Sequence, residues 1–105
     1  MFDQLFGRLK EKYGDDFNWS DIRGKEEFFL NELYSELREN HPLHGKAQAA
    51  LAKCDSKDDV LFLLRNNSYA IVHLTYSKNN VGGFPRYQEF SDLQSAMLHM
   101  ENEYL

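Results

Sequence analysis

The fold is decided by the stretch Asp58-Asp59-Val60-Leu61-Phe62-Leu63-Leu64-Arg65-Asn66-Asn67-Ser68-Tyr69-Ala70-Ile71-Val72-His73-Leu74-Thr75-Tyr76. Two apolar runs, Val60–Leu64 and Tyr69–Tyr76, flank a polar break that contains Asn66 and Asn67. Asparagine tolerates the positive φ angle that a tight hairpin turn requires. The stretch therefore predicts a β-hairpin.

The two runs of this hairpin use the faces of a sheet differently. Val60–Leu64 is apolar at every position, which indicates a strand covered on both sides, near the centre of a sheet. In Tyr69–Tyr76 the side chains alternate between faces. We therefore expect His73 and Thr75 to be neighbours on the more polar face of that strand.

Helical spacing of apolar residues predicts a first helix from about Asp3 to Tyr13, followed by a stop at Gly14. The next residues, Asp15–Asn18, have the composition of a loop. Phe17 and Trp19 are expected to anchor this loop to the core.

A second helix is predicted from its apolar positions, which are Ile22, Phe28, Phe29, Leu30, Leu33, Tyr34 and Leu37. Its start is either an N-cap at Ser20 or, because Gly24 weakens the first turn, a position near Lys25. We expect it to end at His41-Pro42, because proline disfavours the α conformation of the preceding residue. The acidic residues between Glu26 and Glu39 are expected to face solvent.

The remaining segments complete the expected fold. Ala47–Lys53 is predicted as a strand, preceded or replaced by a helical turn, and Tyr87–Phe90 as a short strand after the loop Ser77–Arg86. Ser91 fits the N-cap of a last helix that runs to the C-terminus. The 105 residues thus predict one α+β domain with N-terminal helices, a three- to four-stranded antiparallel β-meander and a C-terminal helix.

Charge and cysteine content restrict the classes of function. The formal net charge is −5, which argues against direct binding of nucleic acid and suits a basic protein partner. Cys54 is the only cysteine, so an internal disulfide is excluded and a reducing compartment is favoured. No apolar stretch approaches the length of about 18 residues that a membrane-spanning helix needs. The N-terminus does not resemble a signal peptide. We expect a cytoplasmic protein without a membrane anchor.

One catalytic pattern is present in the triplet His73-Leu74-Thr75. Phosphoesterases that act on cyclic phosphates use two such triplets facing each other, so that one histidine accepts a proton and the other donates one. This chain has a single triplet, which favours a structural role for His73. A ribonuclease built from His73, Lys46 and either His41 or His44 would want a basic channel that the composition does not suggest.

No metal or cofactor site is expected. His41 and His44 are separated by two residues, but Pro42 prevents the regular helix that would align them. A structural zinc site usually recruits thiolates, and only Cys54 is present. Asp55–Asp59 lacks the glycine and the terminal glutamate of a calcium loop, so its aspartates are predicted to serve a turn.

Three motifs resemble those of a family of small bacterial proteins: His41-Pro42-Leu43-x-Gly45-Lys46, Asp58-Asp59-Val60-Leu61-Phe62 and Val72-His73-Leu74-Thr75. The resemblance covers about Leu33 to Met97. Members are small α+β proteins without a known reaction, and the group is similar to immunity proteins that neutralise the toxins of competing bacteria. This chain departs from the family pattern at Tyr76, where we expect tryptophan, and at Ala49–Lys53, where we expect a more basic strand.

The resemblance, the acidic charge and a surplus of aromatic residues together favour an immunity-type protein that blocks the active site of a basic toxin, in particular a nuclease. The residues expected to bind this partner are Asp58, Asp59, Tyr69, His73, Tyr76 and Tyr87, with Glu32, Glu36 and Glu39 as steering charges. Two alternatives stay open. One is a small hydrolase of phosphate esters that uses His73 and Thr75, and the other is a structural or regulatory homodimer joined through an edge strand.

Overall fold

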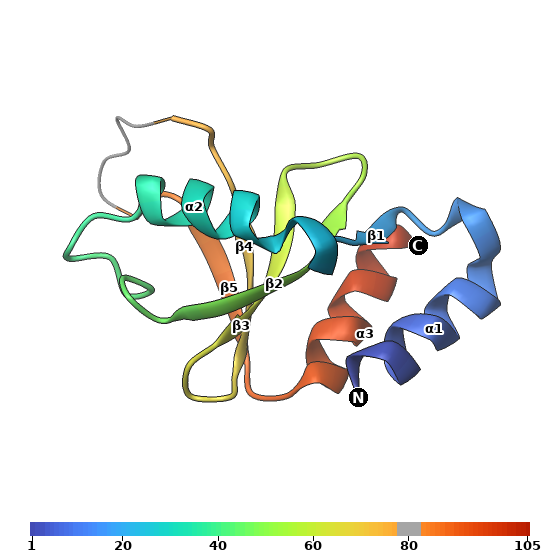
Figure 1. Cartoon of the computed structure of the whole chain (residues 1–105). Coiled ribbons are helices and arrows are strands. Elements are labelled where there is room, and N and C mark those ends of the chain that lie inside the picture. Colours follow the sequence, from blue (N-terminus) through green and yellow to red (C-terminus); the bar gives the residue numbers. More distant parts are fainter. Residues whose placement is uncertain (78–82) are drawn as a thin grey trace.

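One antiparallel sheet of five strands forms the middle of the protein, and its spatial order follows the sequence, β1-β2-β3-β4-β5 (Figure 1). The strands are β1 (Trp19–Asp21), β2 (Ala47–Cys54), β3 (Asp59–Leu64), β4 (Tyr69–His73) and β5 (Arg86–Phe90). The structure is a computed structural model that describes residues 1–77 and 83–105. The predicted α+β class is confirmed, but the sheet has one strand more than the predicted maximum.

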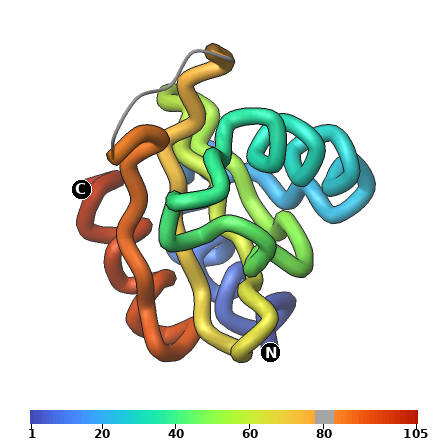
Figure 2. The backbone as a smooth tube through the Cα atoms, turned by 90° about the vertical axis from the view of Figure 1, so that its left-hand side faces the viewer, coloured from blue at the N-terminus to red at the C-terminus, as the bar shows by residue number. Residues whose placement is uncertain are grey.

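Three helices cover the two faces of this sheet: α1 (Phe2–Tyr13), α2 (Glu26–Glu36) and α3 (Leu93–Tyr104). Two short 3₁₀ turns, η1 (Gly14–Asp16) and η2 (Arg23–Lys25), precede β1 and α2. Figure 2 shows α2 on one side of the strands and α3 on the other. α1 packs beside α3, so helices from opposite ends of the chain share one face.

The covered faces form two separate cores. The α2 core contains Ile22, Phe29, Leu33, Leu37, Leu43, Ala47, Ala50, Val60, Phe62, Leu64, Ala70, Val72 and Leu74. The α1/α3 core contains Phe2, Phe6, Leu9, Phe17, Trp19, Leu51, Ala52, Cys54, Leu61, Ile71, Leu93, Ala96, Met97 and Met100. Successive residues of β3 from Val60 to Leu64 enter opposite cores, which explains why this part of the central strand is apolar at every position.

The predicted hairpin is confirmed as β3 and β4. Leu63 lies opposite Tyr69, and Asn67 in the turn has a φ of 64°, in the left-handed region that asparagine tolerates. The turn is held by the Leu64 N–H, which donates to the Ser68 carbonyl at 2.9 Å. The strand ends at His73, however, and does not continue to Tyr76 as predicted.

The prediction for residues 15–25 was partly wrong. Phe17 and Trp19 are buried anchors as expected, but Trp19–Asp21 forms the additional strand β1. Trp19 pairs with Cys54 at the end of β2. Ser20 therefore does not cap a helix, and its hydroxyl donates instead to the Asp55 carboxylate at 2.8 Å.

The second helix starts later and ends earlier than the widest range predicted for it. It starts at Glu26, near the later of the two predicted starts, and ends at Glu36 because Leu37 has extended backbone angles of −86° and 122°. His41-Pro42 follows in a turn and does not terminate the helix. The expectation that all acidic residues of this segment face solvent was wrong for Glu36, which is 2% exposed.

Two further predictions concern the remaining elements. Ala47–Cys54 is a strand, and α3 is capped by Asp92, whose carboxylate accepts from the Ser95 N–H at 2.8 Å. The predicted cap Ser91 is one residue too early, because the first helical residue is Leu93. The predicted loop Ser77–Arg86 lies partly outside the described residues.

Candidate functional site

A polar site lies at one end of the sheet, where β3 begins and β4 ends. Asp59 and His73 are directly opposite each other in the strand register. The Asp59 carboxylate contacts the His73 ring at 2.7 Å, between Oδ1 and Nδ1. The side chain of His73 is 56% exposed and that of Asp59 only 21%. The carboxylate thus orients an imidazole that remains accessible through Nε2.

A second histidine belongs to the same site. A shallow pocket of about 210 Å³ is lined by Asp59, Ile71, His73, Arg86, Tyr87, Gln88, His99 and Glu103. His99 Nε2 lies 3.6 Å from Glu103 Oε1 one helical turn later, and its ring lies 5.3 Å from that of Phe90. We name this site the two-histidine pocket. Each of its imidazoles has a carboxylate beside it.

Thr75 is not a partner of His73 in this site. Because β4 ends at His73, the alternation that would place both residues on one face does not reach Thr75. Its hydroxyl and its N–H donate to Glu36 Oε1 of α2, each at 2.8 Å. The structure therefore separates the two polar residues of the His-x-Thr triplet.

Glu36 organises the chain after β4. Its other oxygen, Oε2, accepts from the Tyr76 N–H at 2.9 Å. Burial by itself would raise the pKa of Glu36, but its side-chain contact with Glu32 and the hydrogen bonds donated by Thr75 and Tyr76 outweigh it and hold that pKa below its usual value. Glu36 is thus a buried, charged acceptor that fixes the backbone of Thr75 and Tyr76.

Tyr76 lies on a different surface from the two-histidine pocket. It has a positive φ of 54°, and its side chain is 45% exposed. Partial burial and the negative charges of Asp58, Glu32 and Glu36 together raise the pKa of its phenol. We name Tyr76, Asp58 and Glu32 the tyrosine surface. It is an exposed aromatic ring in an acidic environment.

The other residues expected to bind a partner do not join this surface in one patch. Tyr69 is half-buried against the α1/α3 core, whereas Tyr87 is half-buried against the α2 core, on the other side of the sheet. Glu39 is exposed in the loop after α2. Asp59 and His73 face each other in the two-histidine pocket, which Tyr87 also lines. The structure thus groups Tyr76 with Asp58 and Glu32, and His73 with Asp59 and Tyr87.

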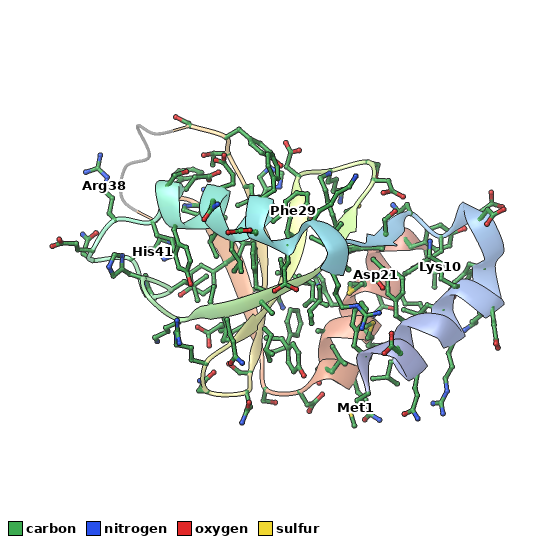
Figure 3. The ribbon with its side chains drawn as sticks, viewed as in Figure 1. Met1, Lys10, Asp21, Phe29, Arg38 and His41 are labelled. Carbon is green, nitrogen blue, oxygen red and sulfur yellow. The ribbon has the colours of Figure 1, made fainter. Side chains whose placement is uncertain are left out.

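His41 has a structural environment. Its ring is buried, Nδ1 accepts from the Leu43 N–H at 3.1 Å, and Nε2 lies 3.0 Å from the Pro85 carbonyl. These contacts are those of a neutral ring that donates from Nε2, and they link His41, labelled in Figure 3 in the loop after α2, to the residue before β5. His44 and Lys46 are exposed in that loop. Within residues 1–77 and 83–105, no three metal-binding side chains are close enough to hold an ion.

Cys54 is buried, and its sulfur lies 3.5 Å from the Ser56 hydroxyl. Nothing in this contact activates a thiolate.

A second groove, of about 280 Å³, lies between α1 and α3, and its lining combines apolar side chains with Arg8 and Lys12. Lys12 is paired with Glu101 of α3 at 2.8 Å.

Sequence reasoning missed five residues of the two-histidine pocket, three of them ionisable: Arg86, His99 and Glu103, together with Ile71 and Gln88. The spacing of His99 and Glu103 on a predicted helix was a usable signal for a side-chain pair. Arg86 gave none, because its position opposite His73 depends on the pairing of β4 with β5.

Comparison of the chain with family models, with curated proteins and with solved structures gives no match. The resemblance to toxin-immunity proteins therefore stays a prediction. Among the described residues, no helix is long and apolar enough to cross a membrane.

Proposed function

We propose that this chain is an immunity-type binding protein that neutralises a basic protein toxin by covering its active site. The observation that carries the proposal is the tyrosine surface, an exposed Tyr76 beside the carboxylates of Asp58 and Glu32. Aromatic rings are frequent energetic centres of protein interfaces, and acidic neighbours complement lysine and arginine. We expect this binding to take place in the cytoplasm.

The backbone at Tyr76 is prepared for binding. Glu36 accepts hydrogen bonds from the N–H groups of both Thr75 and Tyr76, which holds the left-handed conformation of Tyr76 before any partner arrives. A side chain presented from a fixed backbone loses less conformational entropy when it is buried in a complex. Glu36 thus supports binding by positioning Tyr76 and not by steering.

The test is protection of cells from the product of the reading frame next to this gene, which the proposal expects to be a toxin. Co-expression of the chain should restore growth, and Tyr76→Ala should lower protection, more strongly when combined with Asp58→Asn. Leu98→Ala is the matched control, because Leu98 is 56% exposed on α3, on the opposite side of the sheet. Full protection by the Tyr76→Ala/Asp58→Asn double variant would sink the proposal, as would failure to recover any partner by co-purification from the native host.

A hydrolase of phosphate esters is the second candidate, because His99 shares a pocket with His73 and could supply the second proton-transfer group in place of Thr75. The test is turnover of cyclic nucleotides and of RNA by the purified protein. Activity that disappears in His73→Ala and survives in His44→Ala would support it. His44 is the matched control because it is exposed and outside the pocket.

A homodimer has one specific structural basis. β5 is an edge strand whose residues are exposed or half-buried, whereas the other edge, β1, has only three residues. An open edge can pair with the same edge of a second copy. Light scattering after size-exclusion chromatography decides the point, and a mass of one chain would exclude the dimer.

A further inference from the structure

The two-histidine pocket has a set of hydrogen-bond donors that its neighbours do not consume. Arg86 lies over the ring of Phe84 at 5.1 Å, and within residues 1–77 and 83–105 no carboxylate forms an ion pair with it. His73 uses Nδ1 for Asp59 and keeps Nε2 for a ligand, to which this nitrogen donates when the ring carries its second proton. Arg86 and His73 are opposite each other in the strand register, so both side chains start from adjacent points of the sheet.

The charge of the pocket depends on its histidines. Among the described residues of the lining, Arg86 is the one cation when His73 and His99 are neutral, and with the carboxylates of Asp59 and Glu103 the sum of these charges is −1. Protonation of both histidines changes this sum to +1. Lys57 adds a further positive charge nearby, since its Nζ is 3.3 Å from Glu103 Oε2. The groups that face the histidines thus come from the start of β3, from β5 and from α3.

We propose that the two-histidine pocket binds a phosphate-type oxyanion, held by Arg86, His73 and His99. Guanidinium and imidazolium groups donate charge-assisted hydrogen bonds to such oxygens. Asp59 lies beside the His73 ring and Glu103 beside the His99 ring, so each carboxylate helps to orient one imidazole. The inference concerns a surface other than the tyrosine surface and requires no turnover.

The ligand is either inorganic phosphate or a phosphate monoester. The pocket also has apolar wall in Ile71 and half-buried Tyr87, against which the organic group of an ester would pack. Inorganic phosphate and phenyl phosphate are therefore the two probes. Equal affinity assigns the site to the free anion, and tighter binding of phenyl phosphate assigns it to an ester. Both results support the inference.

The experiment is an NMR titration of the full chain, which follows the ring protons of His73 and His99. Saturable shifts of both rings are expected with either probe. Arg86→Gln should weaken binding by about tenfold or more, since it removes charge-assisted hydrogen bonds. Arg38→Gln is the matched control, because Arg38 is an exposed arginine in the loop after α2 and extends away from the chain (Figure 3).

A second arm uses sulfate, whose charge is constant between about pH 5 and 8, where histidines change theirs. Sulfate should bind more tightly at the acidic end, and His73→Gln together with His99→Gln should abolish this difference. Backbone NMR spectra of each variant confirm that the fold is intact. Absence of saturable shifts, or equal weakening by Arg86→Gln and Arg38→Gln, would overturn the inference.

The outcome is separable from the proposed binding of a toxin. Tyr76→Ala should leave phosphate affinity unchanged, and Arg86→Gln should leave toxin protection unchanged. Loss of both properties in both variants would contradict the assignment of two independent sites.

Discussion

Glu36 is the residue whose environment has the largest consequences for both stability and function. It is an acidic residue with 2% exposure, and it accepts three hydrogen bonds from Thr75 and Tyr76. Ionised carboxylates are rarely buried unless their oxygens are satisfied in this way. The pairing joins α2 to the segment that follows β4.

Glu36→Gln should lower the free energy of unfolding by about 2 kcal/mol, because it replaces a charged acceptor by a neutral one whose amide also opposes a backbone N–H. Urea denaturation measures the effect. Glu39→Gln, an exposed change in the following loop, should alter stability by less than about 0.5 kcal/mol. Equal effects of the two changes would show that the hydrogen bonds of Glu36 contribute nothing.

The stabilisation by Glu36 should depend on pH in a defined direction. Its pKa in the folded chain lies below the ordinary value of 4.5, so its contribution is complete above pH 4.5 and is lost as the pH falls through the lower folded value. The stability difference between wild type and Glu36→Gln should therefore be constant near neutral pH and shrink in acid. Denaturation curves from neutral pH to about pH 3 provide the check. A difference that persists in acid would contradict this assignment.

Asn67 tests the conformation of the hairpin turn. Its φ of 64° is unfavourable for a residue with a Cβ unless the residue is asparagine or aspartate. Asn67→Ala should destabilise the chain by about 1 kcal/mol, whereas Asn67→Gly should stay within about 0.5 kcal/mol of wild type. Thermal denaturation compares them, and equal midpoints for the alanine and glycine variants would count against a left-handed turn residue.

At the scale of elements, hairpin and helices were predictable because their patterns are regular, and β2 shows where this fails. Its register with β3 shifts between Ala50 and Ala52, and Leu51 and Ala52 consequently belong to the same core. A bulge of this kind breaks the alternation from which a strand is recognised. Without that alternation only composition was left as a signal, and the composition of Ala47–Lys53 suits a helix as well as a strand.

The elements missed altogether were short or depended on partners far away in sequence. β1 has three residues, fewer than an alternating pattern needs, and it exists because Trp19–Asp21 pairs with the end of β2. The two-histidine pocket similarly requires β3, β4, β5 and α3 to meet. Of its residues, Asp59, His73 and Tyr87 were named from the sequence, but the contact of Asp59 with His73 was not.

The start of α3 offers a direct test of one corrected element. Asp92→Ala should reduce stability by about 1 kcal/mol, because it leaves the Ser95 N–H without its acceptor. Ser91→Ala should have an effect of less than about 0.5 kcal/mol. Chemical denaturation of both variants decides which residue caps the helix, and a larger loss for Ser91→Ala would restore the original prediction.

At the scale of the whole molecule, a net charge of −5 should control how fast a basic partner arrives. Salt screens charges beyond about 8 Å at physiological ionic strength, so the association rate constant should fall as salt is added. Tyr76→Ala should act mainly on the dissociation rate constant, because the ring contributes contact area. Surface plasmon resonance separates the two constants, and an association rate independent of salt would argue against electrostatic steering.

The contact of α1 with α3 has a consequence for biosynthesis. Phe2, Phe6 and Leu9 of α1 are buried against residues of α3 and of the sheet. When the ribosome has completed α1, the residues that will cover it have not yet been translated, and residues 93–104 are translated only after all five strands. The apolar face of α1 therefore stays exposed to solvent while the whole sheet is synthesised. A nascent chain arrested after β4 would be a ready client for chaperones that bind exposed apolar segments.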